Sequence, residues 1–84
     1  MRVTVELTYD MSKDLGVDSL EMEGVQTVAD LIDKAKAQIG PGFEHHTRLA
    51  AIAVNGVLIN YQRGMKTKLA DGDIVAFVKA SAGG

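Results

Sequence analysis

The feature that most constrains the fold is a series of strand patterns interrupted by one amphipathic helical stripe. From Arg2 to Tyr9 apolar and polar residues alternate, which is the period-two pattern of a strand with one buried side. The residues expected on the buried side are Val3, Val5, Leu7 and Tyr9. A second alternating run, Ser19 to Glu23, stops at Gly24. Because residues 10–18 read as a polar connecting loop, these two strands are expected to pair as a hairpin.

The helix is predicted to begin after Thr27, a residue type that caps helix N-termini well. Asp30 occupies the position of the capping-box acid, where Glu or Gln is usual. One apolar stripe follows at helical spacing: Val28, Leu31, Ile32, Ala35 and Ile39. Gly40-Pro41-Gly42 should end the helix, because proline cannot continue it. The stripe is most simply the helix face that packs on a sheet.

The second half of the chain predicts the remaining strands. Residues 43–48 read as a loop anchored by Phe43, and 49–54 read as a strand. Asn55-Gly56 is a strong tight-turn signal, after which residues 57–59 return as a short strand. Asp71-Gly72-Asp73 is turn chemistry in which Asp73 could brace the last strand, residues 74–78.

This order predicts a two-layer α+β domain of the β-grasp (ubiquitin-like) type. A mixed sheet of about five strands would carry one main helix on one face, with the first and last strands paired in the middle. The β-grasp domain is expected over residues 1–78. Residues 79–84 are expected to form a flexible C-terminal tail that ends in Gly83-Gly84.

Composition excludes several classes of function. The formal net charge of −2 gives no electrostatic reason to bind nucleic acid or an anionic membrane. The absence of cysteine removes thiol nucleophiles and thiolate metal sites, and favours a cytoplasmic setting. His45-His46 has no supporting ligand set, so no metal site is predicted. Arg63, Lys66 and Lys68 could form a small basic patch, although a solvated loop explains them equally well.

Three segments together carry a family resemblance: Val54-Asn55-Gly56, the run from Leu69 to Phe77, and the terminal Gly83-Gly84. This combination resembles the MoaD/ThiS family of ubiquitin-like sulfur carriers, and MoaD, the small subunit of molybdopterin synthase, in particular. Lys13-Asp14-Leu15-Gly16 and the helix start at Thr27 also resemble MoaD proteins. One departure is that Lys79-Ala80 stands where MoaD proteins commonly carry a proline pair.

The resemblance implies a carrier and not an enzyme. An activating enzyme of the ubiquitin-activating type (MoaB/ThiF-like, in the sense of adenylating) would use ATP to adenylate the carboxylate of Gly84. A persulfide sulfur would then displace AMP and leave a thiocarboxylate, the sulfur donor. The protein would bind no cofactor itself. A MoaE-like catalytic subunit, or another sulfur acceptor, would receive the sulfur.

The tail must enter the partner's pocket for this chemistry. Six extended residues reach roughly 20 Å. Small side chains suit a narrow passage, and the residues expected to thread are Ala80, Ser81, Ala82 and Gly83. Strand alternation also predicts an open, apolar sheet face beside the tail, and this possible docking face consists of Ala51, Ala53, Ala76 and Val78.

Other functions remain open at this point. Within the fold, the chain could be a ThiS-like carrier for thiamin, a carrier for tRNA thiolation, or a ubiquitin-like protein modifier. In a different class, it could be a β-grasp interaction module whose glycines are only a flexible end.

Overall fold

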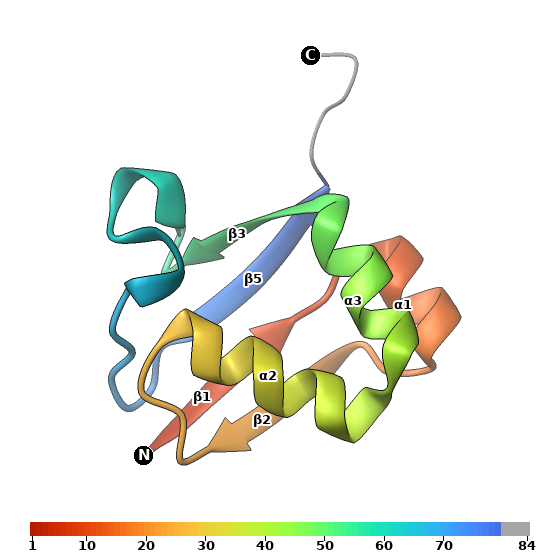
Figure 1. Ribbon diagram of the computed structural model, residues 1–84, viewed down its shortest axis with the longest axis horizontal. Helices are drawn as coiled ribbons and strands as arrows, with labels where there is room; N and C mark the ends of the chain where they lie inside the picture. Colours follow the sequence, from red (N-terminus) through yellow and green to blue (C-terminus); the bar gives the residue numbers. More distant parts are fainter. Residues whose placement is uncertain (80–84) are drawn as a thin grey trace.

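The computed structural model describes residues 1–79 and forms one mixed sheet with helices packed against it (Figure 1). The strands are β1 (Arg2–Glu6), β2 (Ser19–Glu23), β3 (Ala50–Val54), β4 (Val57–Leu58) and β5 (Ile74–Lys79). The α-helices are α1 (Tyr9–Leu15), α2 (Val28–Ile39) and α3 (Pro41–Arg48), and two short 3-10 turns, η1 (Ile59–Tyr61) and η2 (Gly64–Lys66), follow β4.

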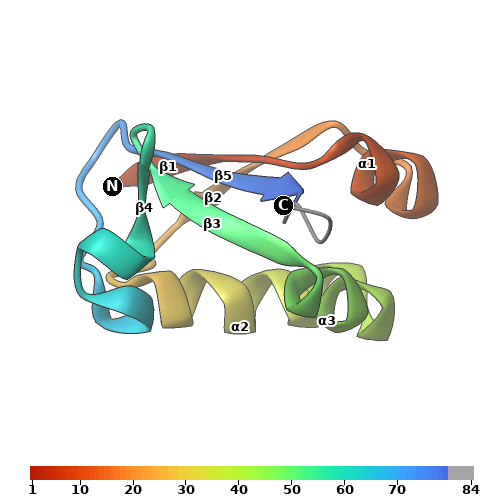
Figure 2. The ribbon, with the colours of Figure 1, turned by 90° about the horizontal axis from the view of Figure 1, so that it is seen from above.

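The strand order is β2-β1-β5-β3-β4, with β1 and β5 parallel and the other pairs antiparallel. The first and last strands therefore meet in the middle, as predicted. α2 and α3 cover one face of the sheet, α1 lies at one end, and no helix of residues 1–79 lies on the other face (Figure 2). The predicted α+β, β-grasp arrangement is confirmed.

The core lies between the sheet and the helices. Val3 and Val5 of β1 and Val75 and Phe77 of β5 face α2, whose predicted stripe is buried at Val28, Leu31, Ile32 and Ala35. Thr27 caps α2 as expected, because its Oγ1 accepts a hydrogen bond from the Asp30 N–H at 3.2 Å. The Asp30 carboxylate in turn accepts from the Gln26 N–H at 3.2 Å, one residue before the usual capping-box partner.

The predicted loop at residues 10–18 is wrong, because most of it is the helix α1. Thr8 caps α1 through an Oγ1 that accepts from the Met11 N–H, and Gly16 ends it in a left-handed conformation. The first strand consequently stops at Glu6. Tyr9, expected in the core, begins α1 and is 77% exposed. Met11 is the buried side chain that α1 contributes to the core.

α2 ends at Ile39, before Gly40-Pro41-Gly42, as predicted, but the predicted loop at residues 43–48 is wrong, because the new helix α3 begins at Pro41. Pro41 stands at the start of α3, where its fixed φ and missing N–H are tolerated. Phe43 is the buried anchor that was expected, and its ring meets Phe77 edge to face at 5.5 Å between centroids. Ile59, predicted in the short strand, opens η1 instead.

Within residues 1–79, no helix has both the length and the apolar character needed to cross a membrane.

Candidate functional site: the end of β5 and the open sheet face

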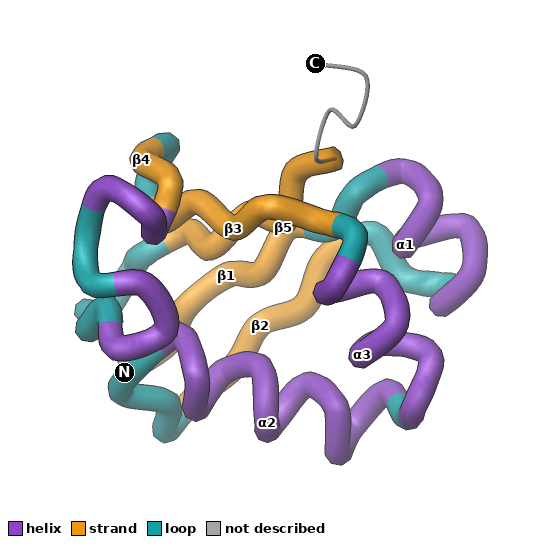
Figure 3. Tube along the Cα trace, turned by 45° about the horizontal axis from the view of Figure 1, so that its top comes forward, coloured by secondary structure: helices purple, strands orange, loops and turns teal. Residues whose placement is uncertain are grey.

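The chemistry predicted from the sequence falls on Gly84, and the threading role falls on Ala80, Ser81, Ala82 and Gly83. These positions lie outside the described residues. What the structure places is the strand that leads to them. β5 extends through Lys79, one residue beyond its predicted end, and its last described residues lie between β3 and α1 (Figure 3).

The start of β5 is fixed by a hydrogen-bond network that joins two of the motifs singled out in the sequence. The Asn55 side chain donates to Asp73 Oδ1 at 2.9 Å and accepts from the Ile74 N–H at 2.9 Å. The second oxygen of Asp73 accepts from the Ala70 N–H at 2.8 Å. The predicted bracing role of Asp73 is therefore confirmed.

The same corner also holds β1. The Asp71 carboxylate accepts from the Arg2 N–H at 2.8 Å, and the Gly72 N–H donates to the Arg2 carbonyl at 2.8 Å. The Thr4 N–H donates to the Asp73 carbonyl at 3.0 Å. These hydrogen bonds tie the start of β5 to β1 and to the β3–β4 turn. They therefore fix the position of β5 in the sheet.

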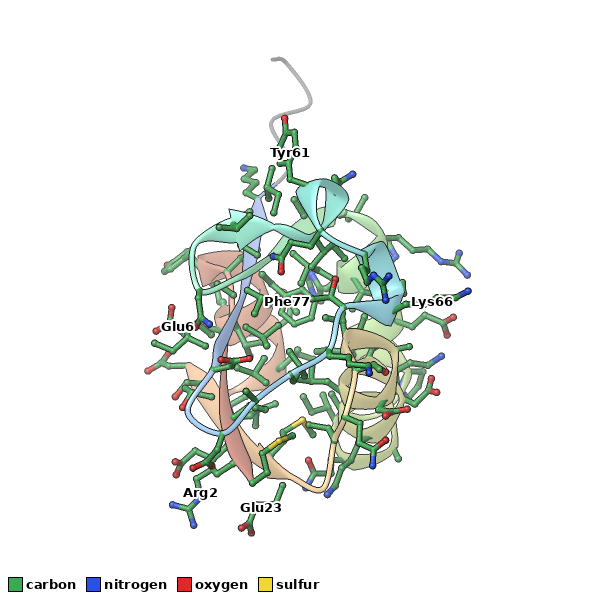
Figure 4. All side chains as sticks on the ribbon, turned by 90° about the vertical axis from the view of Figure 1, so that its left-hand side faces the viewer. Arg2, Glu6, Glu23, Tyr61, Lys66 and Phe77 are labelled. Carbon is green, nitrogen blue, oxygen red and sulfur yellow. The ribbon has the colours of Figure 1, made fainter. Side chains whose placement is uncertain are left out.

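The open sheet face divides into two halves. Along β1 and β2 it is polar: Arg2 and Glu21 form an exposed ion pair at 3.7 Å, and Glu6 points away from the helices (Figure 4). Along β3 and β5 it is apolar, because the register pairs Ala51 with Val78 and Ala53 with Ala76. The four predicted docking residues therefore share one face. Ile74 extends the face along β5.

Within the predicted docking face, Ala53 lies on the open side by register but is only 7% exposed, so it adds little to the exposed surface of that face. The exposed part of the face along β5 consists of Ile74 and Val78.

Two adjoining hollows flank the end of β5. The larger, of about 400 Å³, lies on the helix side, and its lining includes Met11 of α1, Arg48 of α3, and Lys79. The smaller, of about 370 Å³, lies beside Tyr9 and Val78. Thr8, Asp10 and Lys79 line both. Sequence reasoning missed these hollows because both depend on α1, which it assigned to a loop.

The two histidines of the pair have different surroundings. His46 Nε2 lies 2.9 Å from an Asp14 carboxylate oxygen, linking α3 to α1, while His45 is exposed. No group of three or more His, Cys, Asp or Glu side chains in residues 1–79 is arranged to hold a metal ion. Arg63, Lys66 and Lys68 are exposed around η2, and Lys66 lies on the helix side of the molecule (Figure 4).

The fold of the chain is similar to that of several solved structures. Small archaeal modifier protein 1 from Methanosarcina acetivorans is similar at a TM-score of 0.84 and 21% identity, covering 99% of this chain and 96% of that one. A chain of the BexX/CysO complex from Amycolatopsis orientalis is similar at 0.81 and 26% identity, covering 98% and 99%. A Pyrococcus furiosus protein provisionally assigned as molybdopterin converting factor, subunit 1, gives 0.71 and 26%, covering 94% and 97%.

Sequence comparison gives the family directly. No curated protein sequence matched the chain. The model of the ThiS family matches residues 13–84, a stretch that includes the Asp71-Gly72-Asp73 turn, all of β5 and the diglycine. The chain therefore belongs to the ThiS family, within the MoaD/ThiS group of ubiquitin-like carrier and modifier proteins.

Proposed function

We propose that the protein is a sulfur carrier that works through the C-terminal carboxylate of Gly84. The observation that carries the proposal is the family match, which runs without a break from α1 to Gly84. The sheet geometry agrees with it, since the Asn55–Asp73 network fixes the start of β5, and the strand ends at Lys79, five residues before Gly84 in the sequence.

The chemistry requires activation because a carboxylate is a poor acyl donor. An activating enzyme of the ubiquitin-activating type would use ATP to form the Gly84 acyl-adenylate and release pyrophosphate. A persulfide sulfur would attack the acyl carbon and expel AMP. Reduction of the resulting acyl disulfide by a thiol would leave the thiocarboxylate. The described side chains supply no acid, base or metal to these steps in this scheme, so catalysis belongs to the partner.

For the pathway, we propose molybdopterin synthesis, with a MoaE-like subunit as sulfur acceptor. Support comes from the 26% identity, over almost the whole of both chains, to the protein provisionally assigned as molybdopterin converting factor subunit 1. Sulfur transfer for thiamin or tRNA, and attachment to lysines of target proteins, are the alternatives. Recovery of isopeptide-linked conjugates would favour a modifier.

The deciding experiment is intact mass spectrometry after incubation with ATP, an activating enzyme and a sulfur source, followed by thiol-selective alkylation. The alkylation is needed because exchanging oxygen for sulfur adds nearly the same mass as oxidising one of the four methionines. The chain has no cysteine, so an alkylated species must carry acquired sulfur. We expect one alkylated group, lost when Gly84 is deleted. If neither adenylate nor alkylated product forms, the protein is an interaction module.

A further inference from the structure

The larger hollow beside the end of β5 combines an apolar floor with a cationic rim. Met11 is buried beneath it and Ala50 is partly buried, while Leu49, at the junction of α3 and β3, is 59% exposed. A leucine that exposed, at the mouth of a concave surface, offers apolar area that a docked partner would remove from water.

The cationic groups on the rim are weakly paired by the described residues. In residues 1–79 the ion-pair partner of the Arg48 guanidinium is Glu44, at 3.7 Å, in an exposed pair of the kind that contributes little to stability. Among residues 1–79, no carboxylate lies within ion-pair distance of Lys79. Asp10 is the one acid among the lining residues, and His46 is already directed to Asp14. The rim is therefore net positive on a chain whose total charge is −2.

The position of the hollow restricts what can occupy it. Lys79 is the last residue of β5 and pairs with Ala50 of β3, and both line the hollow, so the hollow lies beside the end of the strand. On the proposed function, an enzyme that receives Gly84 must lie within reach of the residues that follow Lys79, so its surface comes close to this point. A partner that contacts only the open sheet face would leave this side of the exit uncovered.

We propose that the hollow between α1 and α3 seats an acidic segment of the activating enzyme, with an apolar side chain against Leu49 and a carboxylate toward Arg48 and Lys79. This inference rests on the proposed function and adds a second docking contact, on the helix side, to the one expected on the sheet. Complementary charge at such a rim accelerates encounter and fixes orientation.

The test measures ATP–pyrophosphate exchange by the activating enzyme with the full chain as substrate. Leu49→Ser should raise KM about tenfold with kcat within about twofold, because the apolar contact with the partner is lost while the chemical step is unchanged. Arg48→Ala should raise KM about fivefold at low salt and less at high salt, because exposed charges are screened. Asp10→Asn removes the one acid of the rim and should lower KM, a change that loss of structure cannot produce.

The chain provides a matched control in Met65→Ser and Lys66→Ala. Met65 is 47% exposed beside a lysine on η2, so the pair repeats the chemistry of Leu49 and Arg48 away from β5. Urea unfolding of every variant checks that the fold is kept. The proposal is overturned if Leu49→Ser and Arg48→Ala match their controls, or if Asp10→Asn raises KM. If the unaltered chain supports no exchange at all, it is the proposed function that fails.

Discussion

At the scale of single residues, the family motifs are explained by one corner of the sheet. Asn55 has a φ of 51°, a left-handed conformation that asparagine tolerates better than most residues, and its side chain joins Asp73 to the Ile74 N–H. The sequence was sufficient to predict the turn and the bracing role of Asp73, because turn residues act locally. It could not predict that Asn55 is the partner, since the two residues are 18 apart.

Replacing Asn55 with alanine is expected to lower the free energy of unfolding by about 2 kcal/mol, from two lost hydrogen bonds and a strained φ. Asn55→Gly should lower the free energy of unfolding by less, since glycine adopts the same φ without strain. Asn60, an exposed residue of η1 with no side-chain hydrogen bond in residues 1–79, provides the control. Urea unfolding at constant m measures the difference. A cost for Asn55→Ala no larger than that for Asn60→Ala would show that the network does not stabilise β5.

At the scale of elements, the longer patterns were predictable and the short helices were not. The strand runs and the 12-residue α2 carry enough periodicity to be recognised. α1 has 7 residues and α3 has 8, too short for a clear stripe, and α3 contains glycine, threonine and two histidines, which form helices poorly. Their stability comes from packing, through Met11 in α1 and Phe43 in α3.

If packing of Phe43 holds α3, Phe43→Leu should lower the free energy of unfolding by about 1.5 kcal/mol, through lost volume and the lost edge-to-face contact with Phe77. Leucine is chosen because Phe43→Ala, at about 3–5 kcal/mol, could unfold a domain this small. His45→Ala, an exposed change on the same helix, should stay within about 0.5 kcal/mol. Equal effects of the two changes in urea unfolding would mean that α3 is not held by its buried ring.

At the scale of the whole molecule, strand order and the sidedness of the sheet were predictable. They follow from alternation together with the rule that a helix must cover an apolar face. The two hollows could not be foreseen, because they arise where α1 and α3 meet the end of β5, and both helices were read as loops. From the sequence alone, Gly84 and a docking face could be predicted as parts of the site, and the role of Gly84 is still a prediction. The two hollows around the end of β5 could be described only from the structure.

The exposed apolar half of the open face should act through burial and not through charge. Val78→Ser, at a residue 40% exposed near the end of β5, should raise the KM of the activating enzyme about tenfold through the loss of buried apolar area. Ile74→Ser, farther from the exit on the same face, should have a smaller effect of the same kind. Neither effect should change with ionic strength, because burial of apolar area is not screened by salt as exposed charges are.

Val57→Ser is the matched control for this face. Val57 lies on the edge strand β4 and is similarly exposed, at 48%. It pairs with Val54 of β3, which faces inward, and directly paired residues share a face, so Val57 lies off the open face. Steady-state kinetics at two salt concentrations separates the possible results. A KM for Val78→Ser equal to that for Val57→Ser would remove the open face from the docking surface. A salt-dependent effect would mean that Val78 acts indirectly, by displacing Lys79 and the cationic rim of the hollow next to it.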